Sequence, residues 1–137
     1  MPVNEVERFK DDAFEIAFYE SIVRHTPNFV EVLIALGDLY TKNKMYDKGL
    51  KVDERLSLMR PDDAVVLYNL ACSYSLLSEV DKAFRTIKRA VKCGYDNFKH
   101  MEQDGDLMNL RKDARFQKYF SRVVDKHKED ADEPERS

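Results

Sequence analysis

The sequence has little glycine and little proline, with four of each in 137 residues. Because these residues interrupt helices, their scarcity leaves long runs, and nearly all of these runs show the helical spacing of apolar residues. No apolar run approaches the roughly 18 residues of a membrane-spanning helix. The first residues also lack the apolar stretch of a signal peptide. We therefore expect a single cytoplasmic domain that does not enter the membrane.

Residues that support catalysis or bind metals are equally sparse. Cys72 and Cys93 are isolated thiols in helical segments, which suits a reducing compartment and offers no zinc site. The histidines are scattered, at His25, His100 and His127. No metalloprotease motif, glycine-rich phosphate loop or nucleophile elbow occurs. We predict that the chain is not an enzyme and uses no metal or cofactor.

Charge is unevenly distributed along the chain, although the net charge is only −3. Residues 1–81 contain 15 acidic and 9 basic residues, whereas residues 82–124 contain 5 acidic and 11 basic residues. The last segment, 125–137, is acidic again. The first half is therefore expected to present an acidic surface and the second half a basic one.

A repeat of 34 residues is the strongest feature that is present. Leu33-x-x-Leu36-Gly37-x-x-Tyr40 is matched by Leu67-x-x-Leu70-Ala71-x-x-Tyr74, and Pro27 and Pro61 are separated by the same interval. A period in this range is typical of stacked helical hairpins, because one hairpin cannot bury its apolar face alone.

The spacing predicts about seven helices and no strand. A helix is expected over 9–25, with Asn28 capping the next one, and two hairpins follow with helices over 29–42, 45–59, 64–77 and 80–92. Gly94 is expected to end the last of these. Beyond it we expect a short helix over 95–101, a final helix capped by Asp113 and reaching Val124, and a charged disordered tail over 125–137.

These residues resemble the tetratricopeptide repeat, a helix–turn–helix unit of 34 residues. The resemblance covers about residues 10–122 and implies a right-handed all-α solenoid. It divides the domain 1–124 into the helix 9–25, full repeats at about 30–63 and 64–97, and a degenerate capping unit over 98–124. The fold class implies binding of a protein or peptide partner rather than catalysis.

The sequence also departs from the family pattern. Glu15 stands where a small residue is expected, and Tyr95 replaces a proline. Asp53 occupies a position that is normally large and apolar. We expect its carboxylate to turn out to solvent or to pair with a nearby base, and the alternative is a partly buried carboxylate with a shifted pKa. The N-terminal unit has room only for its second helix.

By resemblance, the first helix of each repeat lines a concave groove that holds the ligand. The predicted groove residues are Ile34, Asp38, Thr41, Val65, Tyr68, Asn69, Cys72, Ser75 and Lys99. Ile34, Val65 and Tyr68 are expected to anchor apolar groups, and Asp38, Asn69 and Ser75 to select polar ones. An alternative is that Ile34 and Tyr68 pack against the terminal segments. Capture of a C-terminal carboxylate by a Lys/Asn clamp is not expected, because Asp38 would repel it.

Two basic stripes suggest a second function. Lys82, Arg85, Arg89 and Lys92 lie on one helix face, and Arg111, Arg115, Lys118 and Arg122 on another. Such faces bind nucleic acid or another polyanion, or are simply solvated. The acidic pI of about 5.7 argues against a dedicated nucleic-acid binder. A third hypothesis is self-association as a homodimer through the N-terminal helix.

Overall fold

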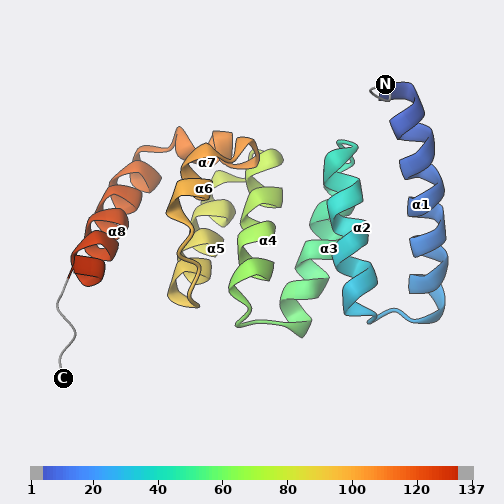
Figure 1. The fold of residues 1–137 in the computed structure, drawn as a ribbon, viewed down its shortest axis with the longest axis horizontal. Helices are drawn as coiled ribbons and strands as arrows, with labels where there is room; N and C mark the ends of the chain where they lie inside the picture. The colour runs from blue at the N-terminus through green and yellow to red at the C-terminus, as the bar shows by residue number, and fades with distance from the viewer. Residues whose placement is uncertain (1–4, 133–137) are drawn as a thin grey trace.

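The computed structural model describes the backbone of residues 5–132 and the side chains of residues 11–132. Within that range the chain is helical without strands, and its helices stand side by side in one row (Figure 1). In chain order the elements are α1 (Glu5–His25), α2 (Val30–Lys42), α3 (Tyr46–Met59), α4 (Ala64–Leu76), α5 (Val80–Lys92), α6 (Phe98–Gln103), the 3-10 turn η1 (Gly105–Leu107), α7 (Met108–Arg111) and α8 (Ala114–Asp132). The predicted all-α solenoid of hairpins is confirmed.

The sequence repeat is visible in the backbone turns as well. Lys44 follows α2 and Ser78 follows α4, and both take a left-handed φ, of 61° and 62°. In each turn the next amide donates back to a tyrosine carbonyl, Tyr40 at 2.8 Å and Tyr74 at 2.9 Å. This geometry satisfies the last carbonyls of a helix. The two hairpins are thus built on the same turn.

Helices α4 and α8 each begin at an aspartate cap, and the second of these caps was predicted. Asp63 Oδ1 accepts from the amides of Val65 and Val66 in α4, at 3.0 and 3.1 Å. Asp113 Oδ1 does the same at the start of α8, at 2.8 and 3.3 Å. The prediction for Asn28 was wrong, because α2 begins one residue later and Asn28 Oδ1 accepts from Arg55 Nη2 at 3.1 Å instead.

Apolar side chains form two adjoining cores. One core lies between α1, α2 and α3 and contains Ile16, Leu33, Leu36, Tyr40, Val52, Leu56 and Val66. The other runs from α4 to α8 and is larger, with Leu67, Ala71, Ala83, Ile87, Met101, Leu107, Leu110 and Phe116 among its members. Helix α4 contributes to both cores, so it is the central wall of the molecule.

Helix α1 is held to the end of α2 by polar contacts. Asp12 is buried, and its Oδ2 accepts from Asn43 Nδ2 at 2.9 Å and pairs with Lys42 Nζ at 3.6 Å. On α1 itself Phe14 and Phe18 are exposed. None of the described helices combines the length and the apolar content that crossing a bilayer would need.

The C-terminal unit differs from its prediction at two points. The short helix begins at Phe98 rather than at Tyr95, because Asn97 Oδ1 caps it by accepting from the amide of His100 at 3.1 Å. Helix α8 runs on to Asp132, so the disordered tail predicted over 125–137 is wrong up to that residue. The part of α8 beyond Val124 contacts the capping unit, since His127 packs on Phe98 with ring centroids 5.0 Å apart. Residues 133–137 lie outside the described range.

Candidate functional site

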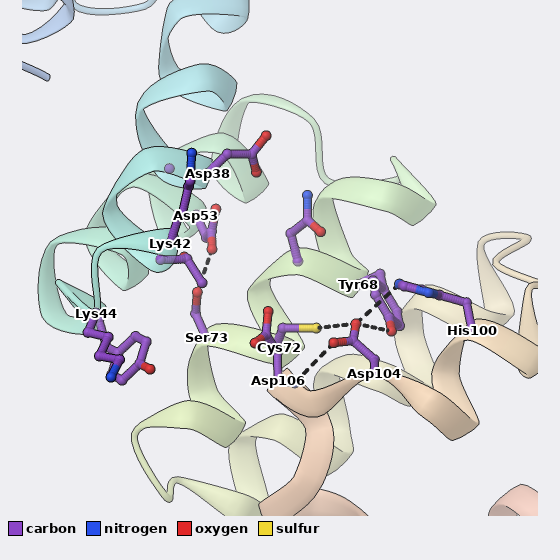
Figure 2. A pocket seen from close by; sticks show the side chains of 14 residues that line it. Asp38, Lys42, Lys44, Asp53, Tyr68, Cys72, Ser73, His100, Asp104 and Asp106 are labelled. Atoms are coloured by element: carbon purple, nitrogen blue, oxygen red, sulfur yellow. Dashed lines mark hydrogen bonds and ion pairs between the residues drawn. The ribbon is translucent and has the colours of Figure 1, made fainter. Parts of the chain in front are cut away.

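A polar cavity lies between α2, α4 and the segment that joins α6 to η1. Its volume is about 520 Å³. Figure 2 shows side chains from all three regions turned toward it. The lining residues are Gly37, Asp38, Thr41, Lys42, Lys44, Tyr46, Asp53, Tyr68, Asn69, Cys72, Ser73, His100, Asp104 and Asp106. The set is acidic overall and draws on both complete repeats and on the capping unit.

Asp104 is the centre of a hydrogen-bond network on one side of the cavity (Figure 2). Its Oδ2 accepts from the Tyr68 hydroxyl at 2.7 Å and from Cys72 Sγ at 3.8 Å, and pairs with His100 Nε2 at 3.2 Å. Its Oδ1 accepts from the amide of Asp106 at 3.0 Å. The network fixes the capping unit against α4, since Asp104 and Tyr68 are 36 residues apart in the chain.

Three groups in or next to this network, those of Cys72, Tyr68 and Asp106, are poor acids, because the pKa of each is raised. Burial, reinforced by the Asp104 charge, raises the pKa of the Cys72 thiol well above its ordinary value. Burial also raises the pKa of Tyr68 and, with the charge of Asp104, that of Asp106. A thiol that stays protonated is a weak nucleophile. The Cys72 side chain therefore serves as a small buried group.

Asp53 forms the opposite wall and is the most unusual residue of the site. It is only 7% exposed, and its Oδ2 accepts from Ser73 Oγ at 2.5 Å. Burial raises its pKa to about 6, the Ser73 hydrogen bond works against this, and the charge of Asp38 adds to it. The expectation that Asp53 turns to solvent or pairs with a base was wrong, because α4 covers it and offers a hydroxyl, and the alternative of a buried carboxylate with a shifted pKa describes it instead.

A smaller apolar cavity adjoins the acidic one. It has a volume of about 90 Å³ and is lined by Ile34, Asp38, Asp53, Leu56, Asp63, Val65, Val66 and Asn69. Ile34 is 40% exposed and Val65 is 59% exposed, which is high for such side chains. Asp38, Asp53 and Asn69 line both cavities. Together the two cavities form one groove across α2 and α4, which we call the α2–α4 groove.

Most predicted groove residues lie in the α2–α4 groove. Asp38, Thr41, Tyr68, Asn69 and Cys72 line the acidic cavity, and Ile34 and Val65 line the apolar one. Tyr68, however, is only 4% exposed and stacks on Tyr95, with ring centroids 4.1 Å apart. It packs against the C-terminal segment, the alternative left open for it, and is not a free apolar anchor.

Two predicted groove residues lie elsewhere. Ser75 is fully buried, and its Oγ accepts from the amide of Leu110 at 3.1 Å, so it holds the capping unit instead of a ligand. Lys99 lies with Phe120 and His127 on a different cavity, between α6 and α8. Both shifts arise because the capping unit folds back over the end of α4, which spacing alone does not reveal.

Several residues of the groove were not singled out for it from the sequence. Lys44, Tyr46, Ser73, His100, Asp104 and Asp106 line the acidic cavity, as do Gly37 and Asp53. Asp53 gave a signal as an acidic residue at a position that the repeat keeps apolar, and Gly37 was noted only as a position of the repeat. His100, Asp104 and Asp106 depend on the packing of the capping unit, and Lys44 on the turn after α2.

The basic stripes are partly engaged within the molecule. Three of their side chains have partners: Lys82 pairs with Glu79 at 3.7 Å, Arg115 pairs with Asp81 at 2.6 Å and Asp113 at 3.0 Å, and Arg111 donates to the carbonyls of Met101 and Asp104. The remaining residues of the stripes, Arg85, Arg89, Lys92, Lys118 and Arg122, are exposed. Arg111 in particular is a structural residue of the capping unit.

Comparisons with known proteins agree with this architecture. No family model matches the chain. It is 38% identical over 80 residues to a chloroplastic protein of Arabidopsis thaliana, an alignment that covers 56% of this chain and 24% of that protein. It is 27% identical over 77 residues to the "Peroxisomal targeting signal receptor" of Candida albicans, covering 56% of this chain and 13% of the receptor. The chain thus corresponds to a minor part of either relative.

A solved structure matches nearly the whole fold. "MamA 41-end from Desulfovibrio magneticus RS-1" aligns with 89% of this chain and 70% of its own, at a TM-score of 0.70 and 22% identity. The match shows the same arrangement of helices, and the 34-residue register of apolar positions and turns recurs in both complete hairpins. The chain therefore has a helical-hairpin repeat fold whose 34-residue register resembles that of the tetratricopeptide repeat.

Proposed function

We propose that the chain is a non-enzymatic adaptor that binds a segment of a partner protein, an extended peptide or a helix, in the α2–α4 groove. The observation behind this proposal is the exposure of Ile34 and Val65 beside the acidic cavity, one from each complete repeat. Exposed aliphatic side chains in a concave surface gain free energy when a partner covers them.

Other observations support the proposal. The polar side chains of the cavity are fixed by one another, as Asp104 is by Tyr68 and His100, so the surface is formed before a partner arrives. One relative, of which the alignment covers 13%, is named "Peroxisomal targeting signal receptor". The groove is short, so we expect a modest affinity, on the order of micromolar, or about −8 kcal/mol.

The test compares two substitutions that introduce the same charge in different places. Val65→Asp places a charge in the groove, whereas Leu58→Asp places one on α3 at a residue that is 83% exposed and lines neither cavity. Proteins captured by the wild-type chain should be lost with Val65→Asp and retained with Leu58→Asp. Capture that survives Val65→Asp, or that fails equally with both variants, would place the binding surface outside the groove.

Binding of a polyanion by the basic stripes is the second candidate. It is favoured by the exposure of Arg85, Arg89 and Lys92 on one face of α5. Phosphate contacts lose affinity steeply as salt rises, whereas an apolar groove loses little, so a salt titration separates the two functions. Self-association stays a prediction. The exposed Phe14 and Phe18 on α1 would form the contact surface, and light scattering at two concentrations tests it.

A further inference from the structure

We propose that the acidic cavity of the α2–α4 groove receives a lysine or arginine side chain of the partner segment, while an apolar side chain of the same segment covers Ile34 and Val65. This inference rests on the proposed function and adds the chemistry that selects the partner. It follows from the balance of charge in the cavity, from the placement of Asp53, and from the continuity of the two cavities.

The charge balance favours a cation. Four carboxylates line the cavity, from Asp38 on α2, Asp53 on α3, Asp104 before η1 and Asp106 within η1. The basic groups that line it are Lys42, Lys44 and His100. Lys42 is paired with Asp12 outside the cavity, and His100 is paired with Asp104. The cavity therefore retains a surplus of negative charge, which attracts a basic side chain and repels an acidic one.

Asp53 is aimed into this cavity from a position where a carboxylate is costly. Burial of a charged group disfavours folding unless the group is paired. Its Oδ2 is bonded to Ser73, but among the described residues no hydrogen bond to its Oδ1 is found. Gly37 faces that oxygen, since a Cβ placed on Gly37 would lie 3.3 Å from it. Among the described residues no buried side-chain oxygen lacks a partner, so this oxygen is open to the cavity, where an ammonium or guanidinium group can donate to it.

An organic cation suits the cavity better than a metal ion. Among the described residues no three His, Cys, Asp or Glu side chains converge closely enough to hold a metal. The volume of about 520 Å³ lies within the range of roughly 300–1,000 Å³ that small-molecule sites occupy. The carboxylates come from opposite walls, which suits a long side chain that enters between them.

The two cavities are close enough for one segment to occupy both. Asp38, Asp53 and Asn69 line each of them, so the acidic and apolar parts meet along these three residues. Asn69 offers an amide that can donate to, and accept from, an extended backbone. The partner segment would thus carry its basic residue near its apolar one, in a fixed order.

The experiment selects short random linear peptides by phage display on the purified full chain. A synthetic peptide of the enriched sequence is then titrated against wild type, Asp38→Asn, Asp53→Asn, Val65→Asp and a control, Asp47→Asn. Asp47 is exposed on α3 and lines neither cavity, so its removal changes net charge equally. A second peptide replaces the basic residue with methionine. Circular dichroism confirms that each variant is folded, and the exposed rim residue Asp38 tests the inference independently of Asp53.

We expect enriched peptides to share a lysine or arginine beside an apolar residue. Asp38→Asn and Asp53→Asn should each weaken the basic peptide about tenfold and the methionine peptide little, whereas Asp47→Asn changes neither. Val65→Asp should abolish binding of both peptides. If binding depends on Val65 but the methionine peptide binds as tightly as the basic one, the inference is wrong and the proposed groove function still stands. If no peptide depends on Val65, the proposed function fails, and the inference fails with it.

Discussion

The hairpins α2–α3 and α4–α5 share one register, yet the position that holds Ile87 in the second holds Asp53 in the first. Ile87 is fully buried in the larger core. Asp53 is buried almost as deeply, but it faces the acidic cavity and bonds to Ser73. The same backbone position therefore supports packing in one repeat and a charged wall in the other.

The residue that faces this position on the first helix of the hairpin also differs between the two repeats. Ala71 faces the second hairpin's core, whereas the first repeat has Gly37. A Cβ on Gly37 would lie 3.3 Å from both Asp53 Oδ1 and Val52 Cγ1, so glycine leaves room for the carboxylate. A position that breaks the packing rule of its repeat, with a neighbour that accommodates the break, is what a binding site in a repeat protein should show.

The largest expected effect comes from moving the acidic residue into the second repeat. Ile87→Asp would place a carboxylate in an apolar core with no hydroxyl or cavity to receive it. We expect a loss of about 4–5 kcal/mol in the free energy of unfolding, enough to leave much of the chain unfolded. Urea unfolding followed by circular dichroism measures it. A loss below about 1 kcal/mol would mean that the second repeat tolerates a buried charge as the first does.

The next effect concerns Asp53 and pH. Its pKa in the folded chain is about 6, above the ordinary value of 3.8, so the folded state binds the proton more tightly than the unfolded state. This stabilisation is complete below pH 3.8 and is lost as pH rises through about 6. Asp53→Asn removes this dependence. The free energy of unfolding of the variant minus that of wild type should therefore be about 2–3 kcal/mol larger near neutral pH than at low pH.

Thermal or urea unfolding across this pH range provides the measurement. Burial also raises the pKa of Asp38 and Asp106, so wild type and variant should both vary with pH. Only the difference between the stability–pH curves of wild type and Asp53→Asn reports the titration of Asp53. Parallel curves would show that Asp53 titrates normally, and the contrast with Ile87 would then reflect packing alone.

The sequence was sufficient for the fold but only partly sufficient for the site. The recurrence of Leu33, Leu36 and Tyr40 after 34 residues was enough to predict the hairpins, and Asp113 was enough to predict the start of the last helix. These are local signals, since a cap or a helical face depends on residues within a few positions. The resemblance to the tetratricopeptide repeat, rather than these local signals, implied that Ile34 and Val65 line a groove, and both line the apolar cavity.

The far wall of the site depends on contacts that are distant in sequence. Asp104 meets Tyr68 across 36 residues, and Ser75 meets the amide of Leu110 across 35. No periodicity links these pairs, because the capping unit departs from the repeat. Asp53 was noticed as an exception, but its orientation depends on Ser73, 20 residues further along the chain.

The smallest expected effect tests whether the two hairpins use equivalent turns. Lys44 and Ser78 both take a left-handed φ near 60°, which costs a residue with a Cβ about 1–2 kcal/mol and costs glycine little. Glycine loses more entropy on folding, so Lys44→Gly and Ser78→Gly should each stabilise the chain by only about 0.5 kcal/mol. Ser78→Ala, which loses the same hydroxyl but keeps its Cβ, should not stabilise. Equal gains in unfolding temperature for the two glycine variants would show that the turns are energetically alike, so that the hairpins differ at Asp53 and Gly37 and not in their connections. A gain at one turn alone would mean that the backbone repeat does not extend to the energetics.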